Sequence, residues 1–152
     1  MKKKNGKYIV FCSGKEHMDE MKEQVSTWFR RVDCEPRIYT AFYNDTATDR
    51  EFREFKKDNS EHLRLLFCID MLNEGVHVDD VDGVILLRPT VSPIIYLQQI
   101  GRALSAGSGK TPVIFDLVNN FDSLSCIDCL KKEMEEAFVL FPTTYGKGFR
   151  FS

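Results

Sequence analysis

Short apolar runs separated by amphipathic segments are the dominant pattern along the chain. Four runs are almost uninterrupted, at residues 8–12, 65–69, 84–87 and 113–115, and a weaker one covers 37–42 after a proline. Runs of this length without polar alternation are typical of strands in a parallel sheet that is covered on both faces. The sequence therefore predicts five strands.

The segments between these runs carry apolar residues every three or four positions, as amphipathic helices do. Helices are predicted after residues 13–16, which match a capping box that begins at Ser13, and over 49–57, 92–104 and 122–138. Strands that alternate with helices imply right-handed crossovers. The predicted fold class is therefore α/β, a three-layer α/β/α sandwich with a mainly parallel sheet.

The length of 152 residues corresponds to one domain. We expect residues 1–152 to form that single domain, with 122–152 as a C-terminal helix and tail. The net charge of -2 provides no overall basic field, so a nucleic-acid partner would need a local basic patch. Because no apolar run approaches the roughly 20 residues that span a bilayer, and no signal peptide is recognisable, we expect a cytoplasmic protein with no membrane partner.

The five cysteines favour reduced thiols over a disulfide framework. Cys126 and Cys129 form a lone C-x-x-C without the second ligand pair that a metal site requires. No metal site is therefore predicted.

Residues 98–111, QQIGRALSAGSGKT, combine two nucleotide signatures. The tail resembles the end of a P-loop, but the first glycine that a P-loop requires would fall at Leu104. Pro112 and an apolar strand follow the glycines, so no helix N-terminus is available for a phosphate. We interpret 106–111 as a turn between a helix and the next strand.

Polar and glycine-rich segments follow three of the predicted strands, at residues 13–15, 70–77 and 88–90. Ligands of parallel α/β sheets bind beyond the carboxyl ends of the strands. Gln98 and Arg102 lie four residues apart and therefore share one helix face. Taken singly, each of these residues also fits a cap, a turn or a solvated loop. Together they predict a polar surface at one edge of the sheet.

Three segments carry a resemblance to a known family. YIVFCS, FCIDMLNEGVHV and YLQQIGRALS resemble motifs IV, V and VI of the superfamily 2 ATP-dependent helicases, broadly of the DEAD/DEAH kind, in that family's order. The resemblance implies the second of two RecA-like domains, a P-loop NTPase-type fold without its own P-loop. It also implies that ATP and Mg²⁺ are held mainly by a first RecA-like domain. This chain alone, without Walker A and B motifs, is expected to be inactive.

The resemblance also implies residue roles. Arg102 is the candidate arginine finger, because Ser105 occupies the position of the family's last motif VI arginine. Ile69 and His77 likewise replace a threonine and an aspartate of motif V. The residues expected at the ATP site are Gln98, Arg102, Asp70, Glu74, Gly75, Gly101 and His77. Those expected near nucleic-acid phosphates are Ser13, Gly14, Lys15, Arg88 and Thr90.

Two functional hypotheses follow. The first is the second motor domain of a superfamily 2 helicase or translocase that acts on DNA or RNA and works with a first RecA-like domain of the same protein. The second is a degenerate RecA-like module that binds nucleic acid without hydrolysing ATP, as the replacements at Ser105, Ile69 and His77 would allow. A stand-alone P-loop enzyme is a third class, which the failed P-loop pattern disfavours.

Overall fold

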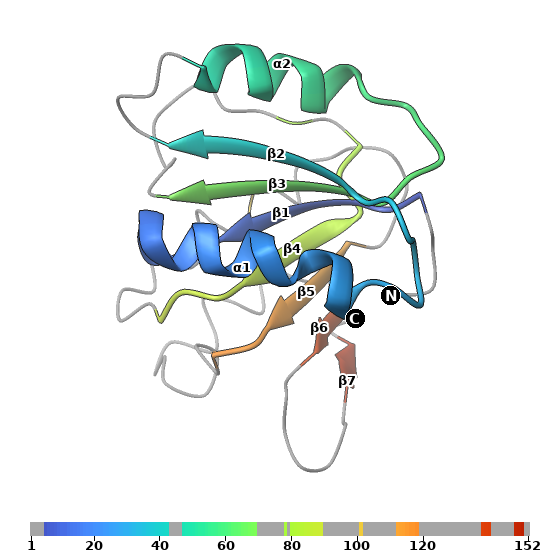
Figure 1. The fold of residues 1–152 in the computed structure, drawn as a ribbon. Coiled ribbons are helices and arrows are strands. Elements are labelled where there is room, and N and C mark those ends of the chain that lie inside the picture. Colours follow the sequence, from blue (N-terminus) through green and yellow to red (C-terminus); the bar gives the residue numbers. More distant parts are fainter. Residues whose placement is uncertain are drawn as a thin grey trace.

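The structure is a computed structural model, and it describes residues 5–42, 47–69, 78, 80–89, 101 and 112–118, and the backbone of 138–140 and 148–150. These residues form one seven-stranded sheet with the order β2-β3-β1-β4-β5-β6-β7, together with helices α1 and α2 (Figure 1). The elements are β1 (Lys7–Phe11), α1 (Lys15–Trp28), β2 (Arg37–Phe42), α2 (Thr48–Lys57), β3 (Arg64–Ile69), β4 (Gly83–Leu86), β5 (Val113–Asp116), β6 (Phe138–Leu140) and β7 (Gly148–Arg150).

The sheet is mainly parallel, as the apolar runs predict. Tyr8 of β1 lies opposite Leu65 of β3 and Gly83 of β4 in parallel register. Strands β2, β5 and β6 add to this set in the same direction, and β7 pairs antiparallel with β6. The five predicted strands are therefore confirmed to within one residue at each end.

The two described helices lie on opposite faces of the sheet. Met18 and Val25 of α1 pack with Tyr8, Val10 and Cys12 of the β1 segment. Because side chains alternate along a strand, Lys7, Ile9 and Phe11 point to the other face. On that face the Lys7 ammonium group lies 5.2 Å from the centre of the Phe55 ring of α2. The predicted three-layer arrangement is confirmed.

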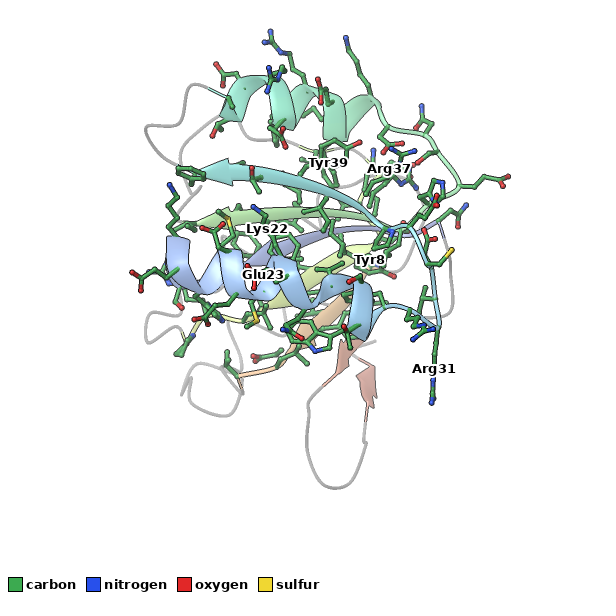
Figure 2. All side chains as sticks on the ribbon, in the orientation of Figure 1. Tyr8, Lys22, Glu23, Arg31, Arg37 and Tyr39 are labelled. Atoms are coloured by element: carbon green, nitrogen blue, oxygen red, sulfur yellow. The ribbon has the colours of Figure 1, made fainter. Side chains whose placement is uncertain are left out.

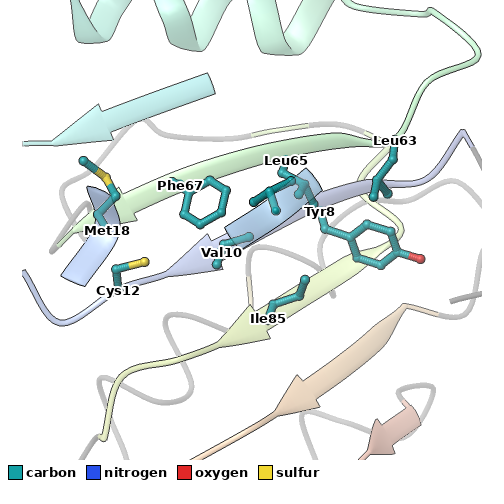
Figure 3. Close-up of a cluster of buried hydrophobic side chains, with 9 residues drawn as sticks. Tyr8, Val10, Cys12, Met18, Leu63, Leu65, Phe67 and Ile85 are labelled. Atoms are coloured by element: carbon teal, nitrogen blue, oxygen red, sulfur yellow. The ribbon is translucent and has the colours of Figure 1, made fainter. Parts of the chain in front are cut away.

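The core beneath α1 is a single apolar cluster centred on the middle strands (Figure 3). Its β3 members, Leu65 and Phe67, and its β4 member, Ile85, are at most 5% exposed. Tyr8 extends the cluster toward β5, where its ring meets Phe115 edge-on at 6.0 Å. Burial raises the pKa of Tyr8 to about 12, so its hydroxyl stays protonated at neutral pH.

Two buried cations hold the C-terminal end of α2 against the sheet. Lys7 donates from Nζ to the Lys56 carbonyl at 3.0 Å, and Arg64 donates to the carbonyl of Asp58. Positive charge at a helix C-terminus is favourable because the last carbonyls lack partners within the helix. Burial lowers the pKa of Lys7, and the neighbouring Arg64 charge lowers it further.

The outer side of β2 is covered by polar side chains of α2. The Thr40 amide donates to Glu51 Oε2 at 3.1 Å, and the Phe42 amide donates to Thr48 Oγ1 at 3.1 Å. Thr48 Oγ1 also donates to the Phe42 carbonyl at 2.9 Å. Within the part of the chain that the structure describes, β2 is thus an edge strand whose last two outward amides are engaged.

Strands β6 and β7 lie in the segment for which the sequence indicates a helix and a tail. Phe138, the predicted helix end, opens β6, while the preceding residues 122–137 lie outside the described part. The helix predicted over 92–104 also lies outside it, except for Gly101, which is helical. None of the described helices is long and apolar enough to cross a membrane.

Candidate functional site

The carboxyl ends of β1 to β5 gather along one edge of the sheet, called here the carboxyl edge. The paired end residues are Phe11, Phe42, Ile69, Leu86 and Asp116. Their arrowheads lie on the same side of the molecule, where α1 begins (Figure 1). The expected polar segments after β1, β3 and β4 therefore leave the sheet at a common edge.

Ser13 and Gly14 connect β1 to α1. Gly14 is the N-cap residue of α1, and no side chain caps the first turn. The predicted capping box at Ser13 is therefore wrong. The Ser13 hydroxyl instead lies 2.7 Å from Nδ1 of His17, and the Ser13 amide donates to the same nitrogen at 3.2 Å.

The start of α1 is open to solvent. A Cβ placed on Gly14 would meet no atom within 4 Å, and the φ angle of -173° is extended backbone that any residue adopts. Neither space nor backbone strain therefore requires a glycine here. An uncapped first turn offers amide N–H groups and the positive end of the helix dipole to an anion.

Lys15 brings a positive charge to the same place. Its ammonium group lies 5.4 Å from the centre of the Phe42 ring at the end of β2. Lys15 therefore extends along the carboxyl edge from β1 past β3, which lies between β1 and β2 in the sheet. A cation held over an aromatic face keeps its charge and loses part of its freedom before a ligand arrives.

Arg88 lies two residues beyond the end of β4, the strand next to β1, and is half-buried. The structure thus brings the segments of Ser13, Gly14, Lys15 and Arg88 to one edge, as expected. Gly101 is half-buried, and a Cβ there would meet nothing within 4 Å. The other predicted site residues lie outside the described part, namely Gln98, Arg102, Asp70, Glu74, Gly75, His77 and Thr90.

His17 is the residue of this edge that the sequence analysis missed. The structure shows its bond to Ser13, and the spacing of four residues on one helical turn was the available signal. Phe42 was likewise treated only as part of a strand. Its contact with Lys15 joins the start of α1 to the end of β2, which no local spacing predicts.

Known proteins share both the sequence pattern and the fold. The family model described as "Helicase conserved C-terminal domain" matches residues 1–107. The chain is 28% identical over 135 residues to the Type I restriction enzyme EcoKI endonuclease subunit of Escherichia coli (strain K12), covering 82% of this chain and 11% of that protein. It is 30% identical over 122 residues to Eukaryotic initiation factor 4A of Cryptosporidium parvum, covering 78% of this chain and 27% of that protein.

The fold is similar to that of the Mss116p DEAD-box helicase domain 2, which was solved bound to an RNA duplex. The TM-score is 0.64 at 20% sequence identity, over 93% of this chain and 54% of that chain. This likeness identifies the RecA-like fold that the sequence resemblance implied. The chain spans between a tenth and about a quarter of the length of the two curated relatives.

Proposed function

Because the chain belongs to the helicase conserved C-terminal domain family, we propose that it is the second motor domain of a superfamily 2 ATP-dependent helicase or translocase. In this role it contacts the nucleic-acid backbone and completes an ATP site between two RecA-like domains. The observation that carries the proposal is the open, uncapped start of α1 at the carboxyl edge, with Lys15 beside it.

The nucleic-acid contact would involve Ser13, Gly14, Lys15, Arg88 and Thr90. Phosphate binding suits this edge because amide groups at the start of α1 and the Lys15 ammonium attract negative charge together. The absence of a side chain at Gly14 allows a phosphate to approach the backbone closely. Contacts of this kind carry no base readout, so binding should depend little on sequence and strongly on salt.

The ATP contact would involve Arg102 and Gln98, with support from Asp70, Glu74, Gly75, Gly101 and His77. A first RecA-like domain would hold ATP and its Mg²⁺. The Arg102 guanidinium would stabilise the charge on the γ-phosphate during transfer to water, a role that is worth roughly 10³ to 10⁵ in rate in related enzymes. Gln98, one helical turn before Arg102, would lie on the same face.

The test is ATP hydrolysis by this chain joined to a first RecA-like domain, measured with and without nucleic acid. We expect nucleic-acid-stimulated hydrolysis that Arg102→Ala lowers by about 10³-fold or more. Arg31→Ala is the matched control, because Arg31 is exposed and projects away from the sheet beyond the end of α1 (Figure 2). Equal turnover in the wild type and Arg102→Ala would refute the arginine-finger role.

A second function is favoured by one specific replacement. Ser105 stands where the family's motif VI carries its last arginine. The chain would then be a degenerate RecA-like module that binds DNA or RNA without supporting hydrolysis. Normal strand binding by the joined protein, with no ATP hydrolysis in the wild type, would select this function over the motor.

A further inference from the structure

The hydrogen bonds around His17 select one tautomer of its neutral ring. A backbone amide can only donate, so the 3.2 Å contact from the Ser13 amide requires a lone pair on His17 Nδ1. The ring proton of the neutral imidazole must therefore be on Nε2. The second contact, from Ser13 Oγ at 2.7 Å, must then use the hydroxyl hydrogen of Ser13 as the donor.

In this arrangement the Ser13 hydroxyl cannot donate a hydrogen bond to a phosphate. A serine hydroxyl has one hydrogen, and here that hydrogen points to His17. The side of Ser13 Oγ that faces solvent then presents lone pairs, which repel the oxygens of a phosphate. Since the Ser13 amide is engaged as well, both donors of Ser13 are occupied by one nitrogen.

Protonation of His17 reverses the direction of the hydroxyl bond. A proton from solvent on Nδ1 turns that nitrogen into a donor to Ser13 Oγ. The Ser13 hydroxyl hydrogen is then released and can point to a phosphate oxygen, and the Ser13 amide becomes available too. The chain from imidazolium to hydroxyl to phosphate is charge-assisted, and each hydrogen bond in it polarises the next.

We propose that His17 is a positioning residue for the nucleic-acid phosphate, and that binding of a phosphate at Ser13 is coupled to uptake of one proton by His17. The inference rests on the proposed function, because the phosphate belongs to the nucleic-acid backbone expected at this edge. It goes beyond that function by making affinity for the strand depend on pH through one named pair of side chains.

Charged groups of both signs lie near His17. On α1 itself these are Lys15, Glu16 and Glu20. From the neighbouring strands, Arg88 follows β4 at the same edge, while Asp116 of β5 points to the other face of the sheet with Leu86. A bound phosphate adds negative charge next to His17, and this charge favours proton uptake at the moment of binding.

The contact between Ser13 and His17 also has a structural role, and the test must separate this role from proton uptake. His17 is the third residue of α1, and its ring reaches back to an amide just before the helix, as the glutamate of a capping box does. His17→Asn preserves an acceptor near the position of Nδ1 and cannot take up a proton. This variant therefore keeps the structural contact and loses the coupling.

The experiment measures binding of a cyanine-labelled single strand of about 15 nucleotides, DNA and RNA in turn, by fluorescence anisotropy. The protein is the whole 152-residue chain at constant ionic strength. Between about pH 8 and about pH 5.5, the wild-type Kd should fall by about tenfold, the size of one charge-assisted hydrogen bond. His17→Asn and Ser13→Ala should remove most of this pH dependence.

His62→Gln is the matched control. His62 lies just before β3, at the opposite edge of the sheet, and glutamine retains an N–H donor for the nearby Asp33. This variant should keep the wild-type pH profile. A tenfold fall in Kd that persists in His17→Asn would overturn the inference, and persistence in Ser13→Ala would show instead that His17 contacts the phosphate directly. Absence of wild-type binding at any pH would refute the proposed function itself.

Discussion

The Lys15 ammonium group lies 5.4 Å from the centre of the Phe42 ring, so the first residue of α1 contacts the last residue of β2 across the end of β3. The two residues come from different elements that meet at the carboxyl edge. Their contact holds a positive charge at this edge, beside the end of β3.

If Lys15 meets a phosphate there, its removal should weaken binding uniformly across strand sequences. We expect Lys15→Ala to raise the Kd by about threefold to tenfold and to reduce the slope of log K against log salt by about one. Lys22→Ala is the control, because Lys22 lies farther along α1 and its Nζ is 3.4 Å from Asp19 Oδ1. Equal losses in the two variants, measured by anisotropy over a salt series, would argue for general charge attraction instead.

Two glycines should lose stability to very different extents on the same substitution. A Cβ on Gly83 would lie 2.0 Å from the Val113 carbonyl oxygen, because β4 and β5 approach closely there. Gly83→Ala should therefore destabilise the fold by about 3 kcal/mol or more. Gly14→Ala should cost at most about 1 kcal/mol, since Gly14 has open space around it.

Urea unfolding followed by circular dichroism measures both effects. The proposed function adds a second expectation for Gly14→Ala, because a methyl group at the start of α1 obstructs a phosphate. Its strand affinity should fall while its stability is nearly unchanged. Full affinity in this variant would contradict close approach of the backbone at Gly14.

Asp33 predicts how the stability of the protein depends on pH. Its buried carboxylate accepts hydrogen bonds from the Glu35 amide at 3.0 Å and the Leu63 amide at 2.7 Å, and it lies 3.1 Å from His62 Nδ1. Burial by itself raises the pKa of Asp33, but these contacts outweigh it and hold the pKa below its usual value. A carboxyl group with a lowered pKa in the folded state stabilises the protein above the unfolded value of about 3.9 and loses this effect below it.

The measurement compares urea midpoints of the wild type and Asp33→Asn between about pH 7 and about pH 3. Asp33→Asn should be clearly less stable at neutral pH, and the difference should shrink as the pH falls below about 4. Asp19→Asn, at an exposed position of α1, should show no comparable difference. A difference in urea midpoint between the wild type and Asp33→Asn that stays constant down to low pH would mean that the Asp33 charge contributes little to stability.

The thiols should differ in reactivity. Burial raises the pKa of Cys12 to about 12, so almost none of it is thiolate at pH 8, whereas Cys34 is exposed. Thiolate is the reactive form of cysteine. Alkylation by iodoacetamide at pH 8, followed by peptide mass spectrometry, should modify Cys34 well before Cys12. Comparable rates at the two positions would indicate that β1 opens frequently.

The strands were predictable because their hydrophobic runs are continuous, and the errors at their ends have physical causes. Lys7 and Arg64 begin β1 and β3, which the apolar runs do not predict because both residues are charged, although they are only 3% and 8% exposed. Their burial depends on the carbonyl groups at the end of α2, which belong to a distant part of the sequence. Gly83 was left out of β4 because the close approach to Val113 is likewise a tertiary feature.

The sequence predicts the location of the site at the carboxyl edge but not the contacts between its side chains. Parallel strands bring their carboxyl ends together, so the positions of Ser13, Lys15 and Arg88 follow from the order of elements. The role of Ser13 does not follow from this order, because a serine before a helix usually caps it. The His17 ring at the third helical position competes for the same hydroxyl, and Gly14 takes the N-cap position instead. Strands β6 and β7 were missed since three residues each are too few to show a pattern.

The engaged amides on the outer side of β2 have a consequence for how the molecule meets other chains. An edge strand with free amides is a template on which a strand of another protein can add, and such additions lead to fibres. Here Glu51 and Thr48 already occupy the amides of Thr40 and Phe42. At these two positions a neighbouring protein can therefore contact this side of the molecule without adding a strand to its sheet.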